Sequence, residues 1–298
     1  MNESKSKNFK KTILKISVSL VLAVALYVMI DKEQFVTSIT HLNLLFLPLI
    51  FALVVTNYVI SSVRWKKLLG IFENSSNIPL TSLIKLYFIG AFFSNFLPTS
   101  IGGDVYKAVR LGKVMNDPSK AFASTFMERF SGVVILAVFS SVGLIFTFKM
   151  LGVGLFIAFW VCALIGLKSM DLIGSKVKRL EKFVDAVKVY FTRKDILSYA
   201  FITSIFVQVC SVFTQHFIFV ALGFDIPIAY SFFAFPVIIL ASFIIPSQNS
   251  FGVQDVLYAT FFASLGITSA DAVSASVIYH LVRLVISLVG GLFYALEK

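Results

Sequence analysis

Long apolar runs separated by short polar links dominate the chain. The runs lie at residues 13–30, 44–63, 80–97, 131–148, 150–167, 196–221, 231–245 and 272–295. Runs of roughly 15–25 apolar residues are long enough to cross a hydrocarbon layer of about 30 Å. Because lipid offers no hydrogen bonds to the backbone, each run is predicted to be helical. The pattern therefore predicts an all-α polytopic membrane protein in which residues 1–298 form a single integral membrane domain.

Several segments do not fit a simple crossing. Residues 1–12 are polar and basic and are expected to form a cytoplasmic tail. Residues 101–118 and 251–265 have helical periodicity but are short and mixed in polarity. In the largest polar segment, 168–195, apolar residues recur at helical spacing opposite a face rich in Lys and Arg. This spacing predicts an amphipathic cytoplasmic connector that lies on the membrane surface.

The composition agrees with a membrane protein and excludes an ordinary soluble one. Hydrophobic residues make up 58% of the 298 positions and charged residues 14%, whereas about a quarter of a soluble domain is charged. The net charge of +11 raises the question of nucleic acid, but the cations lie in the polar links and form no nucleic-acid-binding motif. We therefore expect anionic lipid head groups, and no nucleic acid, as partners.

The cysteines and histidines predict no metal site. Cys162 and Cys210 both lie inside apolar runs, where a thiol behaves as a small buried hydrophobe. The three histidines, His41, His216 and His280, are scattered and have no metal-ligand spacing. No cofactor is expected. The first apolar run follows a Lys-rich start without a small-residue cleavage site, which favours a retained anchor over a signal peptide.

The positions of the cations predict the topology. Basic residues cluster at 5–15, 64–85, 107–120 and 168–194, and each cluster is expected to face the cytoplasm. If all eight apolar runs simply crossed the membrane, the clusters at 107–120 and 168–194 would lie outside. That alternative, eight simple spans with proline kinks, stays open.

Two re-entrant hairpins remove this conflict. Residues 80–118 would enter from the cytoplasm and return, and residues 231–265 would enter from the outside and return. The result is about six full spans plus two opposed re-entrant helical hairpins, with both termini in the cytoplasm of a cell inner or plasma membrane. Broken helices in opposite halves are a known indication of an inverted-repeat-like transport site.

The tip of the first hairpin contains the most informative residues. Pro98 ends the incoming helix, Thr99 or Ser100 can cap the next one, and Gly102 and Gly103 allow a ligand to approach the backbone. The new helix would point its N-terminus at membrane depth, which favours an anion.

A charged stripe follows this tip. Asp104, Lys107, Arg110 and Lys113 recur every three residues. Arg110 suits bidentate contact with a phosphate, and both Arg110 and Asp104 are either site residues or parts of a membrane-edge helix. Lys107 and Lys113 are expected to extend toward the head groups.

A second charged motif, Glu128-Arg129, lies at the start of the 131–148 run. Ionisable groups at this depth are costly unless they are paired or face a wet cavity. Cross-helix pairs of Asp104 with Arg129, or of Glu128 with Arg110, are predicted, with an interfacial anchor as the alternative.

The second tip is rich in neutral donors and acceptors and has one acid. Ser250 is expected to cap the returning helix, close to Gly252, and Asp255 follows the tip as Asp104 follows the first. Arg283, one turn into the last run, is either an anchor at the membrane surface or a counter-charge for Asp255. These residues complete the predicted lipid-binding set.

An enzymatic role is the weaker hypothesis. The chain has no nucleophile–base pair, Walker loop, HExxH motif or acidic cluster for a metal and a diphosphate, and it has only 15 Asp and Glu. We expect no catalytic residues. A membrane-embedded glycosyltransferase, or an accessory scaffold for lipid or cell-envelope glycan synthesis, remains the alternative, with envelope-lipid biosynthesis enzymes as candidate partners. The oligomeric state is left open.

Four segments carry a family resemblance. They are PTSIGGDVYKAVR, ASTFMERFSGV, IPSQNSFGVQDVLYATFFASLGI and the final RLVISLVGG. With them, the chain resembles the lysylphosphatidylglycerol synthase transmembrane-domain family (UPF0104) over roughly residues 13–296. This family includes the flippase half of the bacterial multiple peptide resistance factor. Its third motif is usually Gly-rich and ends in Glu, whereas here Asn249, Ser250 and Phe251 precede Gly252 and Asp255 stands in place of Glu.

The resemblance implies a lipid flippase or a lipid-binding scaffold. The soluble aminoacyl-transfer domain is missing, so synthesis of a lysyl-lipid is not expected. The hypothesis is that the head group of an anionic phospholipid or a polyprenyl-phosphate-linked lipid enters a cavity between the hairpins. Its phosphate would bind the helix N-termini at both tips, with Arg110 and Arg129 as neutralising partners, while rocking of the two halves exposes it to each side in turn.

Overall fold

The computed structural model describes residues 32–75, 77–96, 102–148, 150, 178–245, 247 and 249–297, together with positions 153, 154, 157, 158, 160, 161 and 165. These residues form helices and connecting turns without a β-strand. The helices are α2 (Lys32–Thr40), α3 (Leu47–Leu69), α4 (Leu80–Phe96), α5 (Gly102–Met115), α6 (Pro118–Phe148), α8 (Lys178–Thr192), α9 (Lys194–Ala221), α10 (Ile228–Ile244), α11 (Val253–Phe262) and α12 (Ser269–Leu296), with 3₁₀ turns at Leu44–Phe46, Glu73–Ser75 and Ala263–Leu265.

Four helical segments are long and apolar enough to cross a membrane. They are Leu44–Leu69, Pro118–Gly143, Lys194–Ala221 and Ser269–Leu296. They correspond to four of the six predicted spans, and the chain is an all-α polytopic membrane protein. The predicted span at 13–30, the tail at 1–12 and most of the span at 150–167 lie outside the described residues.

The helix that contains the 131–148 run begins much earlier than that run. It starts at Pro118, whose fixed φ suits a first helical position, after Asp117, which accepts a hydrogen bond from the Lys120 backbone N–H at 3.2 Å. Its first turns pack against α5 and α8, so they need not be apolar all round. The hydropathy run therefore marks only the later part of α6, and Glu128 and Arg129 lie well inside the helix.

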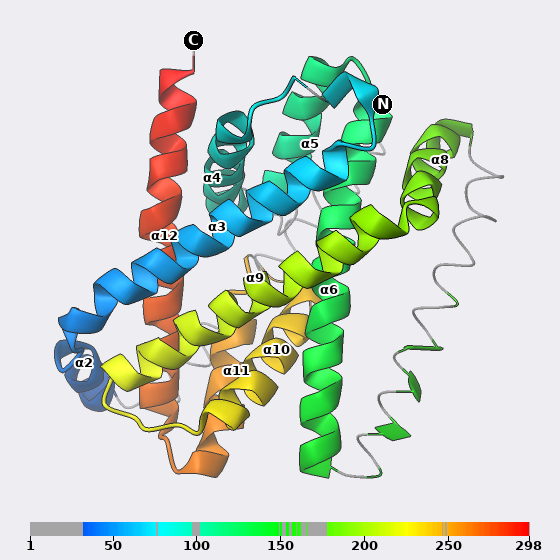
Figure 1. Ribbon diagram of the computed structural model, residues 1–298. Coiled ribbons are helices and arrows are strands. Elements are labelled where there is room, and N and C mark those ends of the chain that lie inside the picture. The colour runs from blue at the N-terminus through cyan, green and yellow to red at the C-terminus, as the bar shows by residue number, and fades with distance from the viewer. Residues whose placement is uncertain are drawn as a thin grey trace, which may run out of the picture.

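Two helical hairpins enter the bundle from opposite ends (Figure 1). Helices α4 and α5 lie side by side and turn back in the middle of the molecule, and α10 and α11 do the same from the other end. The shorter apolar helices Leu80–Asn95 and Ile228–Phe243 form their first arms. The side chain of Asn249 donates a hydrogen bond to that of Asn95, so the ends of the two hairpins meet. The opposed hairpins predicted from the cation count are therefore present.

The described basic segments lie at one end of the bundle (Figure 1). The hydroxyl of Tyr190 in α8 donates to the Leu68 carbonyl oxygen at the end of α3, over 3.1 Å. Lys120, at the start of α6, lies over the Phe72 ring, 5.7 Å from its centroid. The loop after α3, the α5–α6 link and α8 are therefore neighbours, as the topology with hairpins requires.

Helix α8 is amphipathic, as predicted, but its apolar face is covered by protein. Val184, Val187 and Tyr190 are buried, and the Phe183 ring meets Phe126 of α6 at 5.7 Å. The connector is thus docked on α6 and α3 rather than lying only on a lipid surface. The predicted part at 168–177 lies outside the described residues.

Two apolar cores fill opposite ends of the bundle and leave a polar zone between them. Along α3, Ile50 and Val54 belong to one core and Trp65 and Leu68 to the other. Along α9, Ile196 and Ala200 belong to the second core, whereas Val212, Ile218 and Phe219 belong to the first. Polar residues occupy the stretches of both helices between these cores, among them Asn57 and Ser61 in α3 and Ser204 and Gln208 in α9.

Candidate functional site

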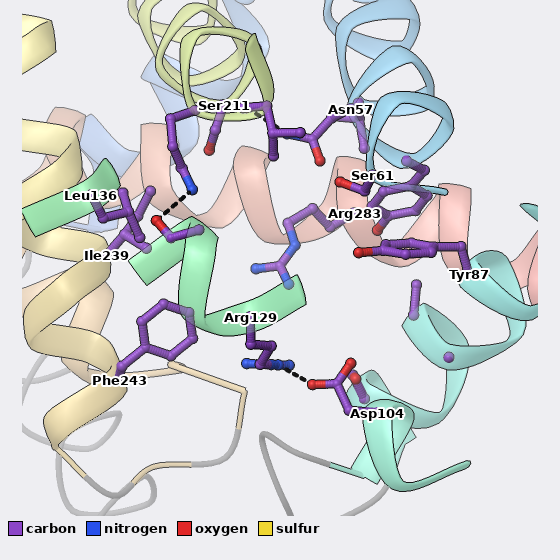
Figure 2. A pocket seen from close by; sticks show the side chains of 18 of the residues that line it. Asn57, Ser61, Tyr87, Asp104, Arg129, Leu136, Ser211, Ile239, Phe243 and Arg283 are labelled. Carbon is purple, nitrogen blue, oxygen red and sulfur yellow. Dashed lines mark hydrogen bonds and ion pairs between the residues drawn. The ribbon is translucent and has the colours of Figure 1, made fainter. Parts of the chain in front are cut away.

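A cavity of about 300 Å³ lies in this polar zone. Its walls come from α3, α4, α5, α6, α9, α10, α12 and the end of the second hairpin. Figure 2 shows Arg129, Arg283, Tyr87 and Asp104 around it, with Phe243 of α10 at one edge. The predicted site residues Asp104, Glu128, Arg129, Ser250 and Arg283 all line it.

A buried network of ion pairs forms one wall. Glu128 pairs with Arg64 and lies 3.6 Å from the Lys107 ammonium, which in turn lies 2.9 Å from Asp104. Asp104 also pairs with Arg129, as predicted from the sequence. The hydroxyl of Tyr87 donates to Glu128 over 2.7 Å. Each acid therefore faces at least two cations, which compensates much of the cost of removing charge from water.

The prediction for Lys107 is wrong. This residue was expected to extend to the membrane surface, yet it is buried and its ammonium lies 3.9 Å from the centroid of the Tyr87 ring and 5.2 Å from that of Trp65. Position 107 follows Asp104 by three residues, so both side chains share one face of α5. That face is turned into the protein, whereas Lys113 is exposed.

Arg283 gives the cavity an excess of positive charge. Its guanidinium lies 5.4 Å from the Tyr279 ring centroid and beside the Tyr58 hydroxyl. Within the described part of the chain, no carboxylate comes into ion-pair range of it. Of the charged residues that line the cavity, Arg64, Lys107, Arg129 and Arg283 are cationic and only Asp104 and Glu128 are acidic. The charged residues of the lining, four cations and two acids, thus sum to a net charge of +2.

Arg110 points elsewhere. Its guanidinium lies 3.4 Å from the Glu297 carboxylate at the end of α12, and it does not line the cavity. The predicted pair of Glu128 with Arg110 is therefore wrong. Three residues turn a helix by only about 300°, so the stripe that begins at Asp104 rotates away from the cavity before it reaches Arg110.

Gly102 and Gly103 begin α5 and are buried, but neither lines the cavity. A Cβ at Gly103 would overlap the carbonyl oxygen of Gly90 and the hydroxyl of Ser94. This glycine therefore allows α4 and α5 to approach each other closely. The preceding tip, including Pro98, Thr99 and Ser100, lies outside the described residues.

The second tip is held by its own backbone and one acid. Gly252, with φ 78°, is the residue that caps α11, so the prediction that Ser250 is the cap is wrong. The Gly252 N–H donates to Asp255 over 2.9 Å, and Asp255 lies 3.5 Å from the His280 imidazole. Neither Gly252 nor Asp255 lines the cavity, whereas Asn249 and Ser250 do.

Asp255 and Arg283 do not form the predicted pair. Asp255 is buried against His280, and Arg283 faces the cavity beside Tyr58 and Tyr279. His280, the partner of Asp255, and Arg283 lie three residues apart along α12, so Asp255 and Arg283 belong to neighbouring but separate clusters. Arg283 is therefore also not an anchor at the membrane surface.

Several cavity residues were missed from the sequence. Arg64, Asn57 and Ser61 interrupt the apolar run of α3, and Gln208 interrupts that of α9. Polar residues within an apolar span are costly and therefore informative, so their positions alone were a usable signal. Tyr87 carried no such signal because tyrosine is common in apolar runs. Among the residues described, no cluster of His, Cys, Asp and Glu could hold a metal ion.

Comparison with known proteins identifies the family. The sequence matches the lysylphosphatidylglycerol synthase TM region over residues 12–291. It is 33% identical over 142 residues to a UPF0104 membrane protein of Methanocaldococcus jannaschii. That match covers 46% of this chain and 40% of the relative's length. No solved structure matches the chain. The match along nearly the whole sequence shows that this chain belongs to the lysylphosphatidylglycerol synthase TM region family.

Proposed function

We propose that this protein moves an anionic lipid across the membrane by binding the lipid's phosphate in the central cavity. The observation that supports this proposal best is the excess of positive charge on the cavity lining, located between the two apolar cores. Charged side chains at such depth are costly and are usually retained for binding or transport. A lining with a net charge of +2 favours an anionic ligand.

The phosphate would bind between Arg129 and Arg283. Figure 2 shows both guanidinium groups directed into the same space. Arg129 contacts Asp104 through Nε, and 36% of its side chain is exposed, so a ligand in the cavity can reach its guanidinium group. Guanidinium groups suit phosphate because they donate two parallel hydrogen bonds and stay charged when partly desolvated. The acyl or prenyl chains would remain in the surrounding lipid.

The hairpins would be the moving parts. Their ends meet at the Asn95–Asn249 hydrogen bond, beside the cavity, and the hairpins extend from there toward opposite ends of the bundle. Tilting one hairpin against the other would open the cavity to one side and then the other, which is the usual geometry of alternating access around a central site. The end that gathers the basic segments would face the cytoplasm of the cell membrane.

A reconstitution assay tests this function. Purified protein in vesicles that contain a fluorescent phosphatidylglycerol should expose the inner-leaflet lipid to a membrane-impermeant quencher faster than empty vesicles do. Arg283→Ala and Arg129→Ala should each slow this exposure by about tenfold, the effect of one lost charge-assisted hydrogen-bonding group. Arg193→Ala is the matched control, because Arg193 pairs with Asp195 in an exposed position away from the cavity.

Two outcomes would contradict the proposal. The first is a wild-type rate equal to that of empty vesicles. The second is an equal rate for wild type, Arg283→Ala and Arg129→Ala, which would remove the cavity arginines from the mechanism. Consumption of a lipid-linked sugar without any lipid movement would instead support the glycosyltransferase alternative.

A further inference from the structure

The cavity has two chemically different walls. The charged wall consists of Asp104, Lys107, Glu128 and Arg129 on α5 and α6. Helices α3 and α9 contribute, besides Arg64, the neutral polar side chains of Asn57, Ser61, Gln208 and Ser211 on the opposite side. In Figure 2, Asn57, Ser61 and Ser211 lie on one side of the space and Asp104 and Arg129 on the other, with Arg283 between them. We call the second set the neutral wall.

The amide groups of the neutral wall are held in one orientation. The Asn57 side-chain nitrogen donates to the Val207 carbonyl oxygen over 2.8 Å. The Gln208 side-chain nitrogen donates to the Gly132 carbonyl oxygen over 3.3 Å. Each –NH₂ group therefore has a backbone partner on a neighbouring helix. Flipping either amide would place its oxygen against a carbonyl oxygen, which is unfavourable, so the orientation follows from the packing.

The amide oxygens are left for the cavity. Among the described residues, no donor reaches the Oδ1 atom of Asn57 or the Oε1 atom of Gln208. An amide oxygen that no protein donor reaches can accept a hydrogen bond from a ligand, so a ligand that donates hydrogen bonds there would bind favourably. The neutral wall thus selects for hydrogen-bond donors, whereas the arginines opposite select for an anion.

The charge of the cavity decides which donor fits. Amide oxygens accept from hydroxyl groups and from ammonium groups alike. An ammonium would be placed close to Arg64, Lys107, Arg129 and Arg283, with only Asp104 and Glu128 to offset them, and both acids already face cations. Charge repulsion at short range is strong in a medium of low dielectric constant, so it disfavours the binding of a ligand's ammonium group there. Uncharged hydroxyl groups meet no such penalty.

We infer that the ligand of this cavity is a phosphate ester that carries a neutral, hydroxylated group, such as glycerol or a sugar, next to the phosphate. The phosphate lies between Arg129 and Arg283, and the hydroxyl groups donate to Asn57 and Gln208. This inference rests on the proposed lipid translocation and narrows its substrate class. A glycerol head group on a phospholipid and a sugar on a polyprenyl phosphate share this chemistry.

The first experiment compares head groups in the vesicle assay. Acyl-labelled phosphatidylglycerol, phosphatidic acid and phosphatidylethanolamine are reconstituted separately with wild-type protein. We expect phosphatidylglycerol to move at least about fivefold faster than the other two, because it alone combines a net negative charge with neutral hydroxyl groups. Equal rates for the three lipids, or a faster rate for the ammonium head group, would overturn the inference while the proposed translocation stands. Movement of none of them would reject the translocation itself.

Substitutions on the neutral wall provide the second measurement. Asn57→Ala and Gln208→Ala should each lower the ratio of the phosphatidylglycerol rate to the phosphatidic acid rate by about fivefold, the effect of one lost hydrogen bond. Asn57→Asp should shift the preference toward phosphatidylethanolamine because it adds a negative charge at the same place. Thr203→Val is the matched control, because the Thr203 hydroxyl bonds only to the carbonyl oxygens of Tyr199 and Ala200 in its own helix.

The ratio separates a selective role from a structural one. A variant that merely folds poorly would slow both lipids together, so its ratio would stay at the wild-type value. An unchanged ratio in both alanine variants, in protein whose monodispersity matches that of Thr203→Val, would therefore overturn the inference.

Competition assigns the source of the hydroxylated group. Unlabelled glucosyl-phosphoryl polyprenol and bare polyprenyl phosphate are each added to the phosphatidylglycerol assay. Stronger competition by the sugar-bearing lipid than by its bare phosphate supports a polyprenyl carrier, and no competition by either supports a glycerophospholipid. Stronger competition by the bare phosphate would overturn the inference, because the neutral wall would then contribute nothing.

Discussion

The two hairpins have similar layouts but use their acids in different ways. Each has an acid shortly after its tip, Asp104 in the first and Asp255 in the second, and each ends beside the cavity. Asp104 lines the cavity and pairs with Lys107 and Arg129. Asp255 is turned away from the cavity, accepts from the Gly252 backbone N–H and contacts His280.

The difference shows that acids at similar positions can have different roles. Asp255 holds the backbone of its hairpin, whereas Asp104 pairs with cations beside the cavity. The first hairpin brings charge to the cavity, because Asp104 and Lys107 share the inner face of α5. The second contributes only neutral groups, Asn249 and Ser250, from its tip. In the proposed function, a phosphate would therefore meet charge mainly from α3, the first hairpin, α6 and α12. The second hairpin bounds the cavity, and Asp255 caps its returning helix by accepting from the Gly252 N–H.

The largest effect is expected from Asp104→Asn. This change leaves Lys107 and Arg129 without their shared counter-charge, and breaking a buried pair by removing one partner typically costs about 3–5 kcal/mol. Because Arg129 is partly exposed to the cavity, we expect the free energy of unfolding in mixed micelles to fall by about 3 kcal/mol.

The control for this change is Asp195→Asn, which breaks an exposed pair with Arg193 at 3.1 Å and should leave stability nearly unchanged. Equal losses of unfolding free energy in the two variants would show that the buried network stabilises the protein no more than the exposed pair does.

A second test concerns the contact between α4 and α5. In Gly103→Ala, the added Cβ would overlap the Gly90 carbonyl oxygen, so the two helices must separate. Overpacking of this kind costs about 1–3 kcal/mol. Gly132→Ala is the matched control, since its nearest neighbours would lie at 3.6 and 3.8 Å, which are ordinary contacts. Thermal unfolding in detergent should show a lower midpoint for Gly103→Ala alone, and equal midpoints would contradict the close packing of the first hairpin.

The corresponding change in the second hairpin should be milder. Asp255→Asn keeps an oxygen that can accept from the Gly252 N–H, and it loses only the charge beside His280. We expect a loss of about 1 kcal/mol, the difference between a charged and a neutral acceptor. The same mixed-micelle titration measures it. A loss as large as that of Asp104→Asn would mean that the two acids are equivalent after all.

The smallest effect is expected where the hairpins meet. A double-mutant cycle of Asn95→Ala and Asn249→Ala should give a coupling free energy of about 0.5–1 kcal/mol, because the two side chains share one hydrogen bond. Asn95→Ala with Ser141→Ala is a suitable reference cycle, since the Ser141 hydroxyl bonds to the Ala137 carbonyl oxygen of its own helix. Zero coupling in the first cycle would argue that the tips do not meet in the folded protein.

Hydropathy and charge located the larger features of this molecule. The spans in α3, α9 and α12 coincide with apolar runs because a lipid environment leaves little choice of residue. The hairpins followed from counting cations in the links, since a charge on the wrong side has a large cost. The start of α6 was missed because its first turns face protein, where the apolar requirement does not hold.

The site was only partly predictable for a different reason. Asp104 and Arg129 could be paired from the sequence because each is a charge that needs a partner at depth. The partners of Glu128 could not, since Arg64 lies 64 residues away and Arg110 looked equally suitable. Whether Arg64 or Arg110 pairs with Glu128 depends on the rotation of α3 and α5 about their axes, and the charge pattern does not determine that rotation.

The sequence by itself determined that this chain is a helical membrane protein, and it favoured two broken helical hairpins over eight simple spans. These properties follow from the transfer of backbone and charge between water and lipid, which acts on each segment separately. Only the tertiary structure decided that Lys107 joins the buried network, that Arg110 lies outside it and that Asp255 bonds to the backbone. It also decided that Asn57 and Gln208 line the same cavity as Arg283. Those outcomes depend on how helices far apart in sequence rotate and pack against one another, and no local pattern encodes them.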